Sequence, residues 1–201
     1  MKSMNIIYLI IIPLAFIFFI RFKQTAPVRR NICIKVLTVL LLLMPFFQNV
    51  NAQWTNQSSG TSANIVSVYF LNTLTGWAAG ETGYIARTTN GGINWVQQSS
   101  PTSNALISII FIDSSTGWIS GTFGTVIKTT NGGVNWTSLS TGISGALRIS
   151  FVNAQTGWTV GASGTILKTT NGGSNWNVQT SGTTSFLLNV RFMDSNTGYI
   201  C

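Results

Sequence analysis

The sequence predicts an all-β fold, an incomplete β-propeller of about three and a half four-stranded blades behind an apolar helical leader. One observation is that the octapeptide Thr-Thr-Asn-Gly-Gly-x-Asn-Trp occurs three times, at 88–95, 129–136 and 169–176. Its closing tryptophans are 41 and 40 residues apart, and a period of ~40–45 residues is typical of a propeller blade. Another is that an alternating apolar segment precedes every copy, which indicates a strand.

The leader contains two apolar runs, residues 5–20 and 36–47. Residues 29–52 resemble a secretory signal, with a basic start, an apolar centre and a small-residue cleavage site after Ala52. Residues 1–28 leave two interpretations open: an N-terminal transmembrane anchor, or a start codon assigned too far upstream. Either interpretation predicts that the part from residue 53 onward is exported and is membrane-anchored, periplasmic or extracellular.

The charge of the chain is concentrated in the leader. The net charge is +8, but residues 53–201 contain only five cations against three acids. Nucleic acid is therefore not an expected partner. The chain has no histidine, and its two cysteines, Cys33 and Cys201, cannot form a disulfide framework. We expect no metal site and no cofactor.

Each repeat unit predicts four short strands. The first ends at a phenylalanine, and a turn opened by Asn or Asp leads into Thr-Gly-Trp, or Thr-Gly-Tyr in the last unit, which begins the second strand. A tight hairpin between two glycines, as in Gly80-x-x-Gly83, precedes the third strand, and the octapeptide turns into the fourth. The four phenylalanines that align the units are Phe70, Phe111, Phe151 and Phe192.

The octapeptide, called the box below, matches the Asp-box pattern with asparagine at the acidic position. We interpret it as architecture: Thr and Asn side chains bond to loop amides, glycines allow positive φ, and Trp packs under the turn. The structural box residues are Thr88, Asn90, Gly92, Trp95, Thr129, Asn131, Gly133, Trp136, Thr169, Asn171, Gly173 and Trp176.

The repeats predict three full blades, at 64–98, 105–139 and 146–179, and half a blade at 186–201. Residues 53–57 resemble a fourth strand with no blade before it, within a propeller part that spans 53–201. Propellers have typically four to eight blades, and an open end exposes an apolar sheet face. We therefore expect further C-terminal blades, so that this sequence is the front part of a longer protein.

The combination of Thr-Gly-Trp, paired glycines and Gly-Gly-x-Asn-Trp resembles the photosystem II stability/assembly factor family, within the Asp-box (bacterial neuraminidase repeat) propellers. The resemblance covers residues 53–201. It implies a non-enzymatic scaffold on the lumenal or periplasmic side of photosynthetic membranes that binds newly made reaction-centre subunits. The expected partner is a protein, such as a membrane-protein assembly intermediate. An Arg-rich surface has been implicated in this family, whereas residues 53–201 contain three arginines.

The candidate protein-binding residues are Arg87, Lys128 and Lys168, which occupy one position in successive blades. They could present a positive arc to an acidic partner, or each could be a solvated strand residue whose stem covers apolar surface. We predict no catalytic residue, because the three acids of this part, Glu81, Asp113 and Asp194, lie in turns and a hairpin.

Two alternative functions stay open from sequence. One is a generic secreted or cell-surface module in a non-photosynthetic bacterium. The other is a fragment of a sialidase-like glycosidase, since those enzymes also carry Asp-boxes but need a nucleophile, an acid and a substrate-binding arginine cluster. Such an arginine cluster is not visible in this sequence.

Overall fold

The computed structural model describes residues 11–12, 15–16, 56–145 and 147–201. The chain divides into two compact units, Met1–Trp54 and Thr55–Cys201. In the first unit the described residues form two short paired strands, β1 (Ile11–Ile12) and β2 (Ala15–Phe16). Several predictions fall outside the described residues: the helical leader, the anchor at 1–28, the signal at 29–52 and most of the strand at 53–57. Within the described residues we find no helix with the length and apolar character that crossing a membrane requires.

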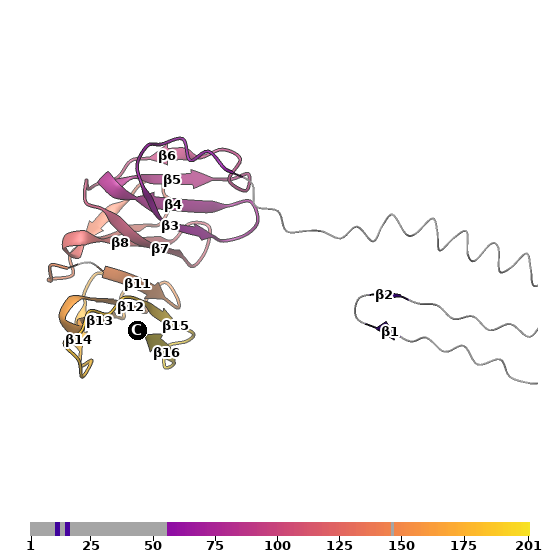
Figure 1. Ribbon diagram of the computed structural model, residues 1–201. Helices are drawn as coiled ribbons and strands as arrows, with labels where there is room; N and C mark the ends of the chain where they lie inside the picture. The colour runs from indigo at the N-terminus through magenta and orange to yellow at the C-terminus, as the bar shows by residue number, and fades with distance from the viewer. Residues whose placement is uncertain (1–10, 13–14, 17–55, 146) are drawn as a thin grey trace, which may run out of the picture. The chain divides into compact units, whose positions relative to one another are not determined.

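The second unit consists of consecutive antiparallel sheets, each a simple up-and-down meander (Figure 1). This arrangement confirms the predicted all-β, incomplete propeller. Blade 1 contains β3 (Ile65–Phe70), β4 (Gly76–Gly80), β5 (Ile85–Thr88) and β6 (Val96–Gln98). Blade 2 contains β7 (Leu106–Phe111), β8 (Gly117–Gly121), β9 (Val126–Thr129) and β10 (Thr137–Leu139). Blade 3 contains β11 (Leu147–Phe151), β12 (Gly157–Gly161), β13 (Ile166–Thr169) and β14 (Asn177–Gln179). The half-blade contains β15 (Val190–Phe192) and β16 (Gly198–Ile200).

The hydrophobic core lies between successive sheets. One cluster joins blades 1 and 2 around Trp77 and Phe111, a second joins blades 2 and 3 around Trp118 and Phe151, and a third joins blade 3 to the half-blade around Trp158. The second strand of each full blade is buried along its whole length. Such a strand has apolar neighbours on both faces, which is what face-to-face stacking of blades requires.

Polar contacts also connect the innermost strands of neighbouring blades. The Ile109 backbone N–H donates to Ser67 Oγ at 3.2 Å, and the Phe192 N–H donates to Ser150 Oγ at 3.1 Å. The Arg148 guanidinium donates through Nη1 to the Ile107 carbonyl at 3.0 Å. These bonds occupy polar groups that the approach of two sheets would otherwise leave without partners.

The glycine-bounded hairpins are short 3-10 turns, η2 (Glu81–Gly83), η3 (Thr122–Gly124) and η4 (Ala162–Gly164). The residue before the closing glycine has positive φ in every copy, and at Phe123 it is 55°. The closing glycine also has positive φ and lies against the loop that leads to the next blade. At Gly124 the backbone N–H donates to the Gly145 carbonyl at 2.8 Å. The Gly164 N–H of η4 donates in the same way to the Ser185 carbonyl at 2.8 Å, so these two hairpins are tied to the following connection.

The turn after each first strand is closed by one side-chain oxygen. Asp113 Oδ1 accepts hydrogen bonds from the Ser115 hydroxyl and from the Ser115 and Thr116 backbone N–H groups, each at 2.7 Å. These bonds, that of the Ser115 hydroxyl first, hold the pKa of Asp113 below its usual value. Asn72 and Asn153 accept the same pair of backbone bonds without a charge.

This difference predicts a pH effect for Asp113→Asn. Because the folded-state pKa lies below the unfolded one, the carboxylate stabilises the fold above its unfolded pKa, and that contribution is lost as the pH falls through the folded pKa. The variant is expected to lose less stability than the wild type between about pH 5 and pH 2, measured by urea unfolding. An equal loss in both proteins would contradict the assignment.

Candidate functional site

The box folds as a closed network of side-chain and backbone bonds. In the second copy, Thr129 Oγ1 donates to Asn131 Oδ1 at 3.0 Å and accepts the Gly133 backbone N–H at 2.9 Å. The Asn131 side chain then accepts the Asn135 N–H at 2.9 Å. The first and third copies repeat these distances within 0.1 Å. In this network the Thr129 hydroxyl donates one bond and accepts one, and Asn131 Oδ1 only accepts. Because an amide oxygen can accept these bonds as a carboxylate oxygen would, asparagine replaces the acidic residue without loss of the turn.

The box tryptophans pack against the phenylalanines of their own blades. Trp95, Trp136 and Trp176 meet Phe70, Phe111 and Phe151 edge to face, with ring centroids 5.9, 6.0 and 6.1 Å apart. These phenylalanine rings lie on the glycine of Thr-Gly-Trp; a Cβ at Gly117 would come within 2.6 Å of Phe111 Cδ1. The box is therefore anchored to the first strand of the same blade.

The tryptophan of Thr-Gly-Trp connects each blade to the next. Trp77 stacks on Phe111 of blade 2 with ring centroids 3.5 Å apart, and its indole Nε1–H donates to the Gly132 carbonyl of the second box at 3.0 Å. Trp118 contacts Phe151 and the Gly172 carbonyl of blade 3 in the same way. The sequence analysis did not predict this contact. The signal that could have indicated it is the nearly constant spacing, 55 and 54 residues, between each Thr-Gly-Trp tryptophan and the first glycine of the next box.

The three candidate cations lie over these tryptophans. Arg87 Cζ is 5.5 Å from the Trp77 ring centroid, Lys128 Nζ is 5.1 Å from that of Trp118, and Lys168 Nζ is 5.2 Å from that of Trp158. This spacing is within cation–π range. The cation and its tryptophan face one another across the second and third strands of the same blade.

The cations are half-buried at the junctions between blades. The Arg87 guanidinium and the Lys128 ammonium lie beside the next box, at Gly132 and Gly172. Burial lowers the pKa of Lys128, and Arg87 Nε is buried without a hydrogen-bond acceptor among the described residues. None of the three cations has an ion-pair partner in the described part of the chain. The arrangement is thus a set of three half-buried positive charges, each held over an aromatic ring.

The acids are occupied by structural bonds. Glu81 Oε2 accepts from the Asn64 side-chain amide at 3.0 Å, while Asp113 and Asp194 close turns. In the residues that the structure describes, no group of three or more His, Cys, Asp or Glu side chains could hold a metal ion. Open grooves of about 920 and 550 Å³ flank η2 and η3 and are lined mainly by serine, threonine and loop backbone.

Comparison with known proteins identifies the repeat. The family model described as photosynthesis system II assembly factor YCF48 matches residues 47–146. The chain belongs to this family. The match covers the first box and the second, together with the Thr-Gly-Trp segments that precede them. The search of curated proteins gave no match.

Solved structures of the family have the same fold. A structure of YCF48 bound to D1 peptide is 23% identical, with a TM-score of 0.58, over 65% of this chain and 44% of that one. YCF48 from Cyanidioschyzon merolae is 24% identical, with a TM-score of 0.55, over 63% of this chain and 40% of that one. The chain thus spans less than half the length of either structure. An ancestral GH74 enzyme matches at 20% identity over 56% of this chain and 18% of that one, with a TM-score of 0.46.

Proposed function

We propose that this chain is a non-enzymatic, exported propeller scaffold that binds a protein partner during the assembly of a membrane-protein complex, as photosystem II assembly factors do. The family match over residues 47–146 carries the proposal. The structure of a family member has been solved with a D1 peptide bound. A D1 peptide is therefore the first partner to test.

The three cations over tryptophans are the proposed contact surface. Because Arg87, Lys128 and Lys168 occupy equivalent positions in consecutive blades, they repeat one positive charge along the propeller. Each charge is held in place by a ring beneath it, so little side-chain freedom is lost when a partner binds. Lys128 is partly desolvated, and a carboxylate brought against it would replace the solvation that burial has removed. An acidic, extended segment fits this surface.

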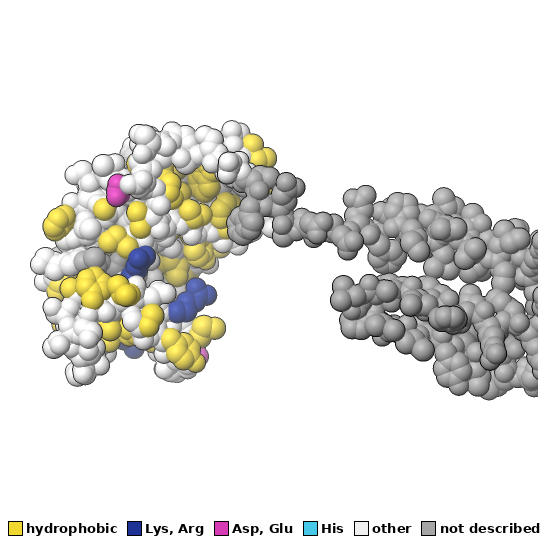
Figure 2. Space-filling view, in the orientation of Figure 1, with side chains coloured by type: hydrophobic (Ala, Val, Ile, Leu, Met, Phe, Trp, Pro, Cys, Tyr) yellow, Lys and Arg dark blue, Asp and Glu magenta, His cyan; other side chains and the backbone are white. Residues whose placement is uncertain are grey.

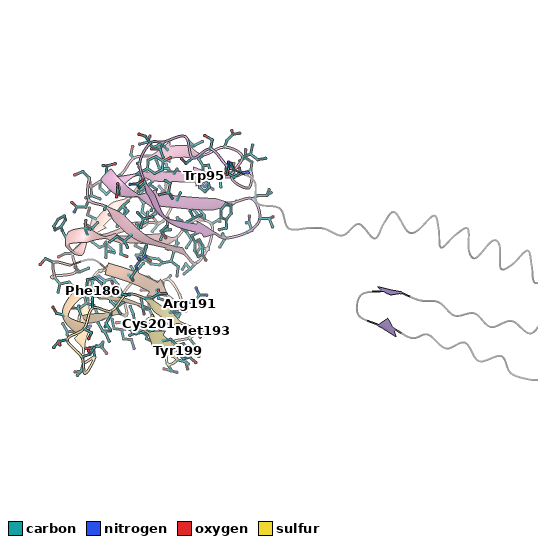
Figure 3. All side chains as sticks on the ribbon, in the orientation of Figure 1. Trp95, Phe186, Arg191, Met193, Tyr199 and Cys201 are labelled. Atoms are coloured by element: carbon teal, nitrogen blue, oxygen red, sulfur yellow. The ribbon has the colours of Figure 1, made fainter. Side chains whose placement is uncertain are left out.

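Binding of a labelled D1 peptide to the full chain, measured by fluorescence anisotropy, tests the proposal. We expect Lys128→Gln combined with Lys168→Gln to weaken binding by about tenfold and to reduce its salt dependence. Arg191→Gln is the matched control, because Arg191 is an exposed cation on the half-blade (Figure 3) and lies over no tryptophan among the described residues. The proposal fails if a scrambled peptide binds equally well, or if the control weakens binding as much.

The remaining parts of the proposal have separate tests. Turnover of a fluorogenic sialoside by the full chain would favour the glycosidase alternative, and we expect none. Export predicts that added protease cleaves a C-terminal tag while the cytoplasmic membrane is still intact, either in whole cells or once the outer layers are permeabilised. A tag that stays protected until the cytoplasmic membrane is broken would contradict export. An exported chain with no affinity for D1 peptide would instead fit the generic secreted module.

A further inference from the structure

The hairpin η3 carries an exposed aromatic ring on a strained backbone. Phe123 is 76% exposed and has a φ of 55°, a conformation that bulky residues rarely adopt. Small polar residues, Thr82 and Ser163, stand at this position in blades 1 and 3 with nearly the same φ. The turn therefore does not require a phenylalanine. A strained and exposed ring that the fold does not need indicates a contact with something outside the chain.

Phe123 lines the open groove of about 550 Å³ beside η3. The groove is formed by this hairpin, by strand β10 and by residues of the two interblade loops that precede and follow blade 2 along the chain. None of the residues that line it carries a charge. The groove beside η2 differs, because Glu81 lines it and Thr82 replaces the ring. Figure 2 shows that few side chains are charged on the face of the propeller part in view. The groove beside η3 thus suits a neutral ligand.

The groove beside η3 offers both fixed and free hydrogen-bonding groups. The Asn104 side chain donates through Nδ2 to Thr125 Oγ1 at 2.8 Å, which orients its carbonyl oxygen as an acceptor. The hydroxyls of Ser138, Ser140 and Ser144 are exposed and have no partner among the described residues. Each of these hydroxyls can donate one hydrogen bond and accept others. A ligand that is rich in hydroxyl groups can exchange bonds with all of them.

We propose that the groove beside η3 binds a neutral saccharide, with one sugar ring stacked on Phe123. A sugar ring presents C–H groups on its face and hydroxyls around its edge. The C–H groups carry partial positive charge and suit the negative face of an aromatic ring, while the hydroxyls bond to Asn104 and to the three serines. A charged ligand would find no ion-pair partner in this groove. A purely apolar ligand would cover the serine hydroxyls without satisfying them, which is unfavourable.

This site is separate from the cations over tryptophans. Hairpin η3 precedes strand β9 and the box follows it, so that Phe123 and the second box lie at opposite ends of that strand. Blade 2 packs against blade 1 and against blade 3, and the groove is built from described residues of blade 2 and its two connections. The inference goes beyond the protein partner proposed above and does not depend on it.

Saturation-transfer NMR of the purified full chain tests the proposal, in a sugar-free detergent that keeps the apolar leader soluble. The neutral probes are cellohexaose, maltohexaose, mannohexaose and N-acetylchitohexaose, and a hyaluronan hexasaccharide is the anionic counterpart. When aromatic protons of the protein are irradiated, the ring C–H protons of at least one neutral hexaose should receive saturation, and those of hyaluronan should not. Phe123→Ser should weaken binding of that hexaose by about tenfold or more, because the stacking is lost. Phe123→Trp should retain binding, since it keeps an aromatic face.

The matched control is Val134→Ser, which removes an exposed apolar side chain from the box of the same blade. It should bind the hexaose like the wild type, as should the variant with both Lys128→Gln and Lys168→Gln, so that this proposal and the one on D1 peptide can fail separately. Circular dichroism should show that all variants keep their strands; Ser163 already shows that serine fits this backbone. The proposal is overturned if no neutral hexaose binds, if hyaluronan binds equally well, or if Phe123→Ser binds like the wild type. Equal weakening in Val134→Ser would also overturn it.

Discussion

Phe111→Ala is expected to lower the free energy of unfolding by about 3–5 kcal/mol, the range for removing a buried phenylalanine. The ring is 1% exposed and lies between two tryptophans, stacked on Trp77 of blade 1 and edge-on to Trp136 of its own box. Its loss opens a cavity at the junction and removes both aromatic contacts. Urea unfolding followed by far-ultraviolet circular dichroism measures the change.

Phe70→Ala is the matched control for this prediction. Phe70 occupies the same repeat position and also contacts its box tryptophan, but no preceding blade stacks on it in the described residues, and it is 43% exposed. We expect its loss to cost about 1 kcal/mol, in line with a partly exposed apolar side chain. Equal costs at the two positions would show that the stacking between blades contributes nothing measurable.

Gly124→Ala is expected to destabilise the protein by more than about 3 kcal/mol, beyond the typical range for a single substitution. A Cβ at this position would overlap the Ile143 carbonyl oxygen, and the residue has a φ of +69°. The loop from blade 2 to blade 3 would have to move away, which breaks the hydrogen bond from the Gly124 N–H to the Gly145 carbonyl. Thermal and urea unfolding measure the loss.

Gly142→Ala separates the steric effect from backbone strain. Gly142 has nearly the same φ, +73°, but nothing lies within 4 Å of a Cβ placed there. It should cost only the strain of a non-glycine residue in this region, about 1–2 kcal/mol. If the two variants are equally destabilised, the close approach of the interblade loop to Gly124 is not what maintains that hairpin.

The period of the box was sufficient to predict the blades. The strands, turns and hairpins of a blade are specified by local interactions. Asn72 and Asp113, for example, close their turns in the same way, by accepting the backbone N–H groups two and three residues further along. The hydrogen bonds within the box likewise join residues two to four positions apart. Local interactions of this kind are readable from a single sequence because the residues that make them are close together along the chain.

The candidate site was less predictable. From the sequence, Lys128 is a polar residue of an exposed strand, whereas its ammonium lies over Trp118 and beside the box of the next blade. That environment depends on how one blade stacks on another, a contact between residues about forty positions apart. Strand β8 is buried on both faces, so the apolar pattern could not indicate which side of the sheet would receive the cation.

The stacking of the blades depends on the tryptophan contact that connects each blade to the next. Hydrogen exchange of the indole N–H groups, followed by NMR, tests it directly. Trp77 and Trp118 donate to the next box and should exchange slowly, as buried, bonded groups do. Trp158 is buried to a similar extent, but its indole has no acceptor among the described residues, so its proton should exchange much faster. Equal exchange at the three tryptophans would contradict the account.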